Sequence, residues 1–408
     1  MVVVGVIAEY NPLHNGHAWH LALTRQSLAA EAVIVIMSGH FTQRGEPAII
    51  DKWSRAKMAI ACGADLVLEL PTIYACSRAT WFARGAISLL SQLEIVTHLS
   101  FGSESGELDP LVKIARILAE EPPEFKALVH RLSKQGLSYP RVQAEALRRL
   151  ADLGDRADLI STANNILAVE YLRELQRQNS RIIPWTIRRQ GAGYHDLGLG
   201  PMASATAIRQ AILAQEPMSA IAGSLPHSCL DIIEQQVGLG RGPVSWYALQ
   251  TAALAVLRRA SREQLAQLPE VSEGLENRLL DHTGAASIDQ WLSATKTKRY
   301  TRTRITRTLA HLLLGITKAD LEQMDQPVPY ARILAMNDVG RTLLRQHRGS
   351  SAIPIIHKPR RDSDQLSAWG GRLLDLDRLA ADLWVLGVPD PHERDGAQDL
   401  TREPVRLF

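Results

Sequence analysis

The sequence is poor in cysteine, in net charge and in long apolar runs, and each shortage excludes a class of protein. Its three cysteines, Cys62, Cys76 and Cys229, show no CxxC spacing and cannot all pair, which argues against a disulfide scaffold or a structural zinc site. The net charge of +3 is too small to indicate nucleic-acid binding by itself. No apolar run approaches the roughly 18 to 20 residues that cross a bilayer, and no basic segment typical of a signal peptide opens the chain. We therefore expect a cytoplasmic protein with no membrane partner.

The 408 residues, 46% hydrophobic and 22% charged, have the composition of an ordinary globular protein with two or three domains. The first two hundred residues alternate β-branched apolar runs with segments of helical periodicity. Strands are predicted at 2–7, 32–37, 66–70, 96–101 and 181–187, and helices at 16–30, 51–62, 77–92, 108–120, 125–153 and 163–178. This order predicts an α/β fold with a doubly wound parallel sheet, whose ligands bind beyond the carboxyl ends of the strands.

The second half of the chain has a different character. Leu, Ala, Arg and Gln dominate predicted helices at 244–260, 262–268, 273–281 and 302–315, and strands are indicated only at 353–357 and 381–387. The final stretch, from about residue 388, has little apolar content and is expected to be loosely held. We therefore divide the chain into an α/β domain at 1–215 and a mainly helical, basic domain at 216–408.

The first predicted strand leads through a proline turn into a helix that opens with His14, Asn15, Gly16 and His17. Two histidines three residues apart share one face of a helix, and the glycine lets a phosphate approach the backbone. Free N–H groups at a helix N-terminus attract anions, and imidazoles can stabilise the charge that grows as pyrophosphate departs. A chance surface pair is the alternative, but the strand, turn and helix around the motif favour the phosphate site. A zinc site is not indicated, because no third ligand has suitable spacing.

A second candidate segment follows the strand at 32–37 and extends over 38–47. Its glycines and hydroxyl side chains suit a loop that moulds around a ligand, and a plain connecting loop is the alternative. The candidate substrate contacts in and after this segment are Ser38, Gly39, Gln43, Arg44 and Lys57. The helix that follows also places Lys52 and Arg55 near the same rim, where one or more of these cations is expected to meet phosphate.

Further candidate nucleotide-binding residues lie at or just after the other predicted strand ends. They are Gly102, Asn164, Asn165, Arg188, Arg189, Ser204, Thr206 and Arg209. The glycine lets an adenine or ribose approach the backbone, and one asparagine is expected to cap its helix while the other contacts the nucleotide. Segment 204–209 places hydroxyl residues before a helix and an arginine one turn in, which predicts a second phosphate cradle, with a simple capped helix as the alternative.

Together, the pair His14 and His17 and the segment 204–209 predict a two-sided clamp for a triphosphate. No pattern resembles a nucleophile with its base, so covalent catalysis through Ser or Cys is not supported. The clamp best serves attack on the α-phosphate of ATP, with adenylate transfer and release of pyrophosphate. Mg²⁺ is expected to accompany ATP as the phosphate partner, although no carboxylate cluster is singled out as a protein metal ligand.

These residues resemble the HxGH nucleotidyltransferases, a superfamily with a Rossmann-like fold, through segments 14–17 and 204–209. The sequence is more closely similar to one family within it, the tRNA(Met) cytidine acetate ligases. The matching segments are 5–17, 38–48, 63–71, 101–104, 164–167 and 193–196, with thinner matches at 273–277 and 298–304. The resemblance is strong to about residue 210, so it implies that 1–215 is the catalytic, ATP-binding domain.

The resemblance implies a reaction in two steps. Acetate and ATP form acetyl-adenylate and pyrophosphate, and the exocyclic amine of the wobble cytidine in elongator tRNA(Met) then accepts the acetyl group, giving N(4)-acetylcytidine. Acetate is already ionised at neutral pH, so the first step needs orientation and charge stabilisation and no general base. In this reading His14 and His17 are catalytic, as stabilisers of the departing pyrophosphate.

The resemblance also implies which residues hold ATP. By position they are Ile7, Ala8, Glu9, Tyr10, Asn11, Pro12, Leu13, His14, Asn15, Gly16, His17, Ala18, Trp19 and His20, with Gly102, one of Asn164 and Asn165, and one of Arg188 and Arg189. Two positions depart from the family pattern, because His40 and Leu13 stand where asparagine and phenylalanine are expected. The change at His40 concerns the expected acetate pocket, which the sequence does not locate.

A basic run far along the chain acquires a function only through this resemblance. It comprises Lys296, Lys298, Arg299, Arg302, Arg304 and Arg307, with one aromatic and no acid among them. A solvated helix face explains such a run equally well, but with tRNA as acceptor it becomes a candidate surface for the tRNA backbone. A second basic region comprises Arg341, Arg345, Arg348, Lys358, Arg360 and Arg361.

Two rival functions share parts of this pattern. An adenylyltransferase for a small phosphorylated substrate, such as a mononucleotide or phosphopantetheine, would use the same clamp but needs no long basic C-terminal region. A non-catalytic ATP- or tRNA-binding protein would keep the fold, but the presence of both histidines argues against it. The sequence gives no indication of the oligomeric state.

Overall fold

A computed structural model describes residues 1–135, 139–150, 159, 162–189, 198–347, 349 and 351–407. Its strands are β1 (Val3–Ala8), β2 (Ala32–Ser38), β3 (Leu66–Leu70), β4 (His98–Ser103), β5 (Ile183–Arg188), β6 (Ala331–Met336), β7 (Ile355–Ile356) and β8 (Val405–Arg406). The helices of the first half are α1 (Asn15–Ser27), α2 (Lys52–Ala61), α3 (Thr72–Ala75), α4 (Ala79–Gln92), α5 (Leu108–Glu120), α6 (Pro123–Ser133), α7 (Tyr139–Leu150), α8 (Ala163–Arg177) and α9 (Ala205–Leu213). Those of the second half are α10 (Met218–Ile221), α11 (His227–Gly238), α12 (Gln250–Arg259), α13 (Arg262–Ala266), α14 (Leu275–Asp281), α15 (Ile288–Thr295), α16 (Arg302–Leu314), α17 (Lys318–Gln323), α18 (Asp338–Gln346), α19 (Pro359–Asp362), α20 (Ala368–Trp384) and α21 (Gln398–Thr401).

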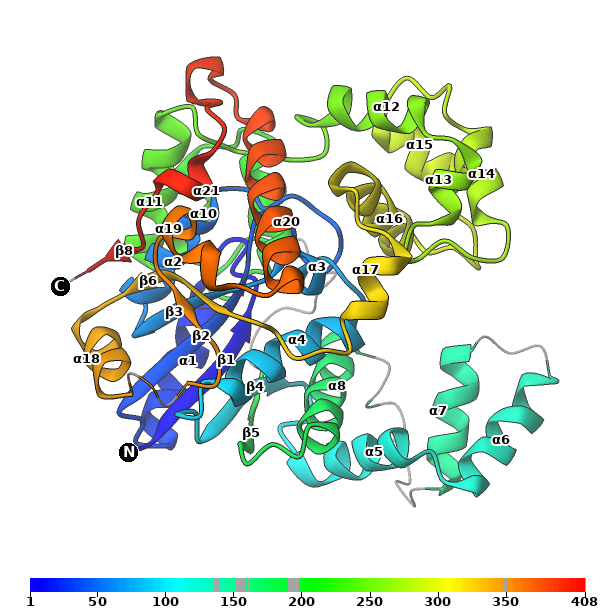
Figure 1. Cartoon of the computed structure of the whole chain (residues 1–408), viewed down its shortest axis with the longest axis horizontal. Helices are drawn as coiled ribbons and strands as arrows, with labels where there is room; N and C mark the ends of the chain where they lie inside the picture. The colour runs from blue at the N-terminus through cyan, green and yellow to red at the C-terminus, as the bar shows by residue number, and fades with distance from the viewer. Residues whose placement is uncertain are drawn as a thin grey trace.

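The sheet has the order β5-β4-β1-β2-β3-β6-β7, with β8 paired to β6. Strands β1 to β5 run parallel to one another, and Val3 to Ala8 pair in register with Ala32 to Met37. The α/β fold and its five predicted parallel strands are therefore confirmed, with strand ends shifted by at most two residues. Figure 1 shows the sheet with helices on both faces and two helical lobes beside it, one formed by α5–α7 and the other by α12–α16.

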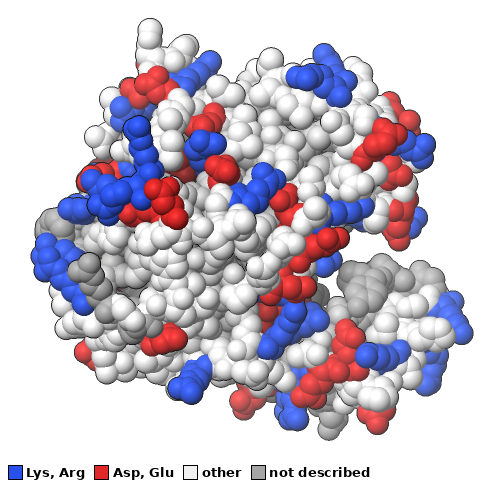
Figure 2. All heavy atoms as spheres, in the orientation of Figure 1, with Lys and Arg blue, Asp and Glu red and all other residues white. Residues whose placement is uncertain are grey.

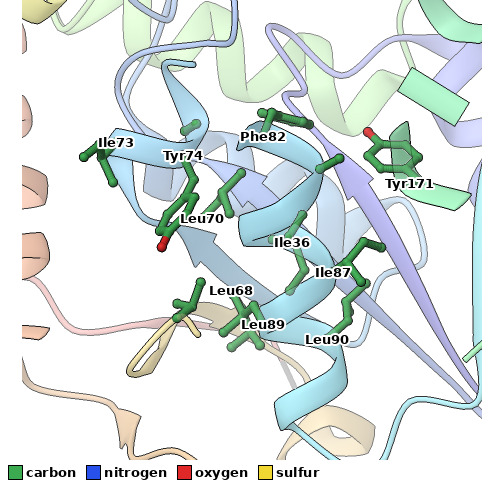
Figure 3. Packing of buried hydrophobic residues seen from close by; sticks show 14 of the residues in the cluster. Ile36, Leu68, Leu70, Ile73, Tyr74, Phe82, Ile87, Leu89, Leu90 and Tyr171 are labelled. Atoms are coloured by element: carbon green, nitrogen blue, oxygen red, sulfur yellow. The ribbon is translucent and has the colours of Figure 1, made fainter. Parts of the chain in front are cut away.

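Both faces of the sheet are buried, which explains the unbroken apolar runs of its strands. Successive side chains of β2 point to opposite faces, so Ile34 and Ile36 enter one core cluster while Val33 and Val35 enter the other. Figure 3 shows Ile36, Leu68 and Leu70 packed among side chains of α3 and α4. The opposite face is covered by α1, α2, α9 and α11.

The second half of the chain contributes strands that the sequence analysis missed. The run Ala331–Met336 is buried throughout and forms β6, antiparallel to β3, while β7 and β8 pair parallel to β6. Strands of the sheet therefore lie on both sides of the predicted boundary at 215/216. Only Ile355 and Ile356 of the predicted strand 353–357 are in a strand.

The predicted strand at 381–387 is wrong. Helix α20 runs to Trp384, and Leu376, Ala380 and Trp384 bury one stripe of it at a spacing of four residues. The predicted helix 125–153 covers two helices, α6 and α7, while 136–138 and 151–153 lie outside the described residues, as do Arg348 and the matching segment 193–196. The other predicted helices are confirmed, most of them to within two residues and 16–30 and 244–260 to within six.

The prediction that the chain is loosely held after residue 388 is also wrong, because Asp399 is buried in a network of charges. The Lys52 Nζ atom lies 2.6 Å from a Glu69 oxygen and 2.7 Å from an Asp399 oxygen. Arg332 of β6 pairs with both carboxylates, and all four side chains are at most 2% exposed. This network, termed here the buried charge network, joins α2, β3, β6 and α21 across the core.

The segment 246–314 forms a helical unit with a core of its own. Its buried side chains include Leu257, Leu279, Trp291 and Leu309, which come from α12, α14, α15 and α16. None of the helices in the described part of the chain combines the length and the apolar character that crossing a bilayer requires. The three cysteines are free thiols, with the sulfurs of Cys62 and Cys229 3.5 Å apart.

Candidate active site

The turn after β1 fixes the two histidines at the start of α1. His14 is the N-cap, and its Nδ1 accepts a hydrogen bond from the Gly16 N–H at 3.1 Å. The His14 N–H in turn donates to Nδ1 of His17 at 3.4 Å, and the two rings stack with their centroids 3.8 Å apart. A Cβ at Gly16 would lie 2.9 Å from the His14 ring, so only glycine leaves this ring its place.

These hydrogen bonds fix the chemistry of both rings. Because each Nδ1 accepts a backbone N–H, the proton of the neutral imidazole resides on Nε2, and each ring keeps one donor. Burial lowers the pKa of His14 to about 4 and that of His17 well below its ordinary value, and the nearby charge of Arg189 lowers both further. Both rings are therefore neutral hydrogen-bond donors at neutral pH, which suits stabilisation of phosphate oxygens better than proton transfer.

The two histidines line a cavity of about 430 Å³ at the carboxyl ends of β1 and β4. The sequence-predicted residues on its wall are Ile7, Ala8, Glu9, Tyr10, Asn11, His14, Gly16, His17, Trp19, His20, Gln43, Arg44, Gly102, Asn164, Arg189, Ser204, Thr206, Arg209 and Arg307. Those that are not on the wall are Pro12, Leu13, Asn15, Ala18, Ser38, Gly39, Lys57, Asn165, Arg188, Lys296, Lys298, Arg299, Arg302 and Arg304. One cavity therefore gathers residues from both predicted phosphate cradles and from the loop after β2.

The structure separates the two pairs that the sequence left open. Asn164 lies on the cavity wall, whereas Asn165 is buried and its side chain accepts the Glu104 N–H at 2.9 Å. Neither asparagine caps its helix, because the N-cap of α8 is Thr162. Arg189 lines the cavity, whereas the Arg188 side chain lies against Gly106.

The second cradle faces the first across the cavity. The Ser204 hydroxyl caps α9 by accepting the Ala207 N–H at 3.1 Å. Arg209 donates to the Asn11 carbonyl at 2.7 Å and so joins α9 to the turn before α1. Asn15 completes the connection by donating to the carbonyls of Pro201 and Gly223, both at 2.9 Å. Asn15 therefore holds the two cradles together without lining the cavity.

The loop after β2 is held by the helical unit. The Trp246 indole donates to the Gly45 carbonyl at 3.0 Å, and Arg307 of α16 donates to the Gln43 carbonyl at 3.3 Å. Gly45 has a φ of +76°, and a Cβ there would lie 2.6 Å from the backbone of Arg307. The helical unit thus shapes the cavity, to which α16 also contributes Thr303.

The prediction that Lys52 and Arg55 lie at the rim is wrong. Lys52 belongs to the buried charge network, and Arg55 donates to the backbone carbonyls of Glu9, Ser38 and Gly39. Burial lowers the pKa of Arg55 to about 10, which leaves it charged. Arg55 therefore holds the backbone at the start of the loop, and Lys52 lies in the core; neither is at the rim, where the sequence analysis expected a cation to meet phosphate.

His40 also lies away from the cavity. Its ring is 2% exposed and packs 4.8 Å from the Trp384 ring and 5.6 Å from the Trp53 ring, centroid to centroid. Burial lowers the pKa of His40 well below its ordinary value. The expected departure from the family pattern at this position therefore lies in the packing beneath the loop and not among the residues that line the cavity.

The sequence analysis missed an apolar wall of the cavity. It is formed by Ala79 and Phe82 of α4 and by Leu167 and Tyr171 of α8. The spacing of Asn164, Leu167 and Tyr171 by three and four residues places them on one helix face, so this signal was present in the sequence. Glu46, at the end of the loop, also lines the cavity and pairs with Arg209 at 3.4 Å.

The basic run at 296–307 is largely neutralised within the helical unit. Arg299 pairs with Glu273, Arg302 with Asp289, and Arg307 with Glu270, while Arg304 donates to the Glu270 carbonyl. Lys296, Lys298, Arg299 and Arg302 are exposed, whereas Arg304 and Arg307 are half-buried. Figure 2 shows acidic side chains interspersed with basic ones over this lobe.

Comparison with known proteins assigns the chain to a family. The family model of the HIGH nucleotidyl transferases matches residues 1–399. The tRNA(Met) cytidine acetate ligase of Syntrophomonas wolfei is 38% identical over 414 residues, covering 99% of each chain, and that of Halothermothrix orenii is 40% identical over 415 residues, covering 98% of each. The chain belongs to the tRNA(Met) cytidine acetate ligase family.

Solved structures of this family agree with the fold. The crystal structure of Thermotoga maritima TmcAL without ligand superposes with a TM-score of 0.95 at 32% identity, and both chains are covered completely. The same protein bound with α-thio ATP gives a TM-score of 0.94 at the same identity and coverage. A family member with this fold therefore binds an ATP analogue.

We expect the variant Gly45→Ala to separate the loop after β2 from α16. The added Cβ meets the Arg307 backbone, which cannot move without displacing α16, so a loss of about 1–3 kcal/mol in unfolding free energy and weaker ATP binding are expected. Urea denaturation and calorimetric ATP titration measure the two effects. Gly315→Ala is the matched control, because Gly315 has a similar φ of +64° with nothing within 4 Å of the added Cβ. An equal loss in both variants would attribute the effect to backbone strain and contradict the steric explanation.

Proposed function

We propose that this chain is an ATP-dependent acetate ligase that forms acetyl-adenylate and acetylates the wobble cytidine of elongator tRNA(Met). One observation carries the proposal: His14 and His17, whose Nδ1 atoms are occupied by backbone N–H groups, line the same cavity as the N-terminus of α9. Family membership supports the choice of acetate and tRNA(Met), because the relatives are named for both. Since tRNA is the proposed acceptor, we propose that the chain acts in the cytoplasm.

In the first step, a carboxylate oxygen of acetate attacks the α-phosphorus of ATP. The bond from that phosphorus to the bridging oxygen breaks, and pyrophosphate leaves with the electron pair. Negative charge grows on the departing oxygens, where two neutral imidazole donors and the guanidinium of Arg209 stabilise it without reorganising. The backbone N–H groups that open α9 add a fixed positive potential on the opposite side.

The remaining contacts proposed for ATP follow from the position of the cavity walls. Gly102, Asn164 and Arg189 lie on the side of β4, β5 and α8, where the adenine and ribose are expected. Among the described residues, no group of three His, Cys, Asp or Glu side chains is arranged to hold a metal ion. We therefore propose that Mg²⁺ enters with ATP and is held chiefly by its phosphate oxygens.

We propose that the exposed cations of the basic run, Lys296, Lys298, Arg299 and Arg302, contact the tRNA backbone. Figure 2 shows a notch between the lobe of α12–α16 and the lobe of α5–α7, and Thr303 and Arg307 of α16 line the cavity. A tRNA whose anticodon reached the cavity would therefore pass close to the helical unit. Arg304 and Arg307 serve instead to hold the helical unit and the loop after β2.

The double variant Lys296→Ala/Lys298→Ala is expected to weaken tRNA binding without altering acetyl-adenylate formation. Two lost phosphate contacts should reduce the slope of log affinity against log salt by about 2, because each contact releases about one counterion. Filter binding at several salt concentrations measures the slope. The matched control is Arg341→Ala/Arg345→Ala on α18, in the second basic region. A loss of affinity in the control alone would place the tRNA surface on α18 and overturn this proposal.

The function is tested by incubating the protein with labelled acetate, ATP and bulk tRNA, followed by nucleoside analysis. Labelled N(4)-acetylcytidine in tRNA(Met), with pyrophosphate release that depends on acetate, is the expected result. Release that depends on a mononucleotide or on phosphopantetheine would identify an adenylyltransferase for a small phosphorylated substrate. ATP binding without any release would identify a non-catalytic protein.

A further inference from the structure

The transfer step requires a proton acceptor, and the cavity offers few. As the cytidine amine attacks the acetyl group, the nitrogen gains a positive charge and must lose a proton. His14 and His17 do not suit this role, because their Nδ1 atoms already accept backbone N–H groups. Among the described residues on the cavity wall, only Glu9 and Glu46 are carboxylates.

The two carboxylates have different surroundings. Glu46 has a side chain 44% exposed and pairs with Arg209, so solvent and an ion pair both stabilise its charge. Glu9 lies at the end of β1, directly before the turn that carries the histidines, and one of its oxygens accepts the Gln43 N–H at 2.7 Å. Burial raises the pKa of Glu9 despite that hydrogen bond and the charges of Arg209 and Arg44, which lower it. Glu9 is thus a stronger base than a solvated carboxylate.

Glu9 shares the cavity with an apolar wall that suits a base ring. Ala79, Phe82, Leu167 and Tyr171 form this wall. Figure 3 shows Phe82 and Tyr171 at the same end of the core, on α4 and α8. Aromatic and apolar side chains commonly stack on unpaired bases of RNA, so this wall fits a pyrimidine ring and an acetyl methyl group.

We propose that Glu9 is the catalytic base of the acetyl-transfer step. The amine nitrogen forms a bond to the acetyl carbonyl carbon, the bond from that carbon to the adenylate oxygen breaks, and AMP leaves with the electron pair. The amine proton passes to the Glu9 carboxylate. The inference rests on the proposed function, and it concerns the second step only, since acetate attacks ATP as an anion with no proton to lose.

The variant Glu9→Gln tests the proposal, because glutamine keeps an oxygen for the Gln43 N–H while it cannot accept the proton. Because Glu9 also lines the cavity proposed for ATP, acetate-dependent exchange of pyrophosphate into ATP is expected to fall as well, but by less than about tenfold. Acetyl transfer from preformed acetyl-adenylate to tRNA, measured in a single turnover, is expected to fall about 10²- to 10⁴-fold. The transfer rate of the unaltered protein should also fall as the pH falls and Glu9 is protonated. The ionisable groups around Glu9 that influence this protonation are Arg44, Arg209, Glu46 and Tyr171. The variant should lose this pH dependence.

Glu46→Gln is the matched control, because Glu46 is the other carboxylate on the cavity wall among the described residues. Because Glu46 acts through Arg209, its loss is expected to change exchange and transfer to a similar extent. Equal losses of exchange and transfer in Glu9→Gln, or transfer at the unaltered rate, would overturn the proposal. Absence of acetate-dependent exchange in the unaltered protein is a different result, which would refute the proposed function itself.

Discussion

The variant His14→Asn is expected to lose acetate-dependent pyrophosphate release by about 10²- to 10³-fold, the usual effect of removing one preorganised donor from a developing oxyanion. Asparagine is among the best N-cap residues, so the helix start that His14 caps should survive the change. What disappears is the Nε2–H donor toward the cavity. Single-turnover pyrophosphate release at saturating ATP and acetate measures the effect, and His17→Asn is expected to behave alike.

Alanine at position 14 separates the two roles of this histidine. His14→Ala removes the cap as well, so it should lose the same activity and in addition about 1 kcal/mol of stability. His227→Asn at the start of α11 is the control, because His227 is exposed and its ring contacts only Asp231 among the described residues. Affinity for tRNA should be nearly unchanged in all four variants. Full pyrophosphate release by His14→Asn would show that the imidazoles do not stabilise the leaving group.

The site could be predicted from the sequence where its geometry is local. The strand, the proline turn and the helix start lie within residues 2 to 27, so hydrophobic periodicity and cap residues were enough to place His14 and His17 together at the start of a helix, where they line the cavity. The cradle at 204–209 is local in the same sense. The sequence also contained the information on which asparagine lies on the cavity wall, because only Asn164 shares a helix face with Leu167 and Tyr171.

The sequence failed where a residue's partners lie far along the chain. Lys52 and Arg55 were placed at the surface because a charged side chain is normally solvated, and nothing near them in the sequence indicates Glu69 or Asp399. Arg332 interrupts the apolar run of β6. Because its partners lie far away in the sequence, the run was not predicted to be a buried strand. The tail after 388 was misjudged because a single buried Asp399 anchors a segment with little apolar content.

The second large expected effect is a loss of stability when the buried charge network is disrupted. Lys52→Met removes one of the two cations that the buried carboxylates of Glu69 and Asp399 share and leaves only Arg332 to pair with them. Removing one partner of a buried ion pair typically costs about 3–5 kcal/mol. Urea denaturation at pH 8 measures the loss. Lys57→Met, on the same helix but half-exposed, is the control and should stay within about 0.5 kcal/mol. An equal effect of the two substitutions would contradict the role assigned to the network.

The pH dependence of Lys52→Met distinguishes electrostatics from packing. Burial raises the pKa of Glu69 to about 7, against the ordinary 4.5, even with Lys52 and Arg332 lowering it. A carboxyl whose pKa is raised on folding costs stability as the pH rises through that value, and removing Lys52 raises it further. The stability of the variant should therefore recover as pH falls from 8 to 6, and its deficit relative to the unaltered protein should shrink. A deficit that stayed constant over this range would indicate lost packing, because methionine fills the volume of the lysine stem without its charge.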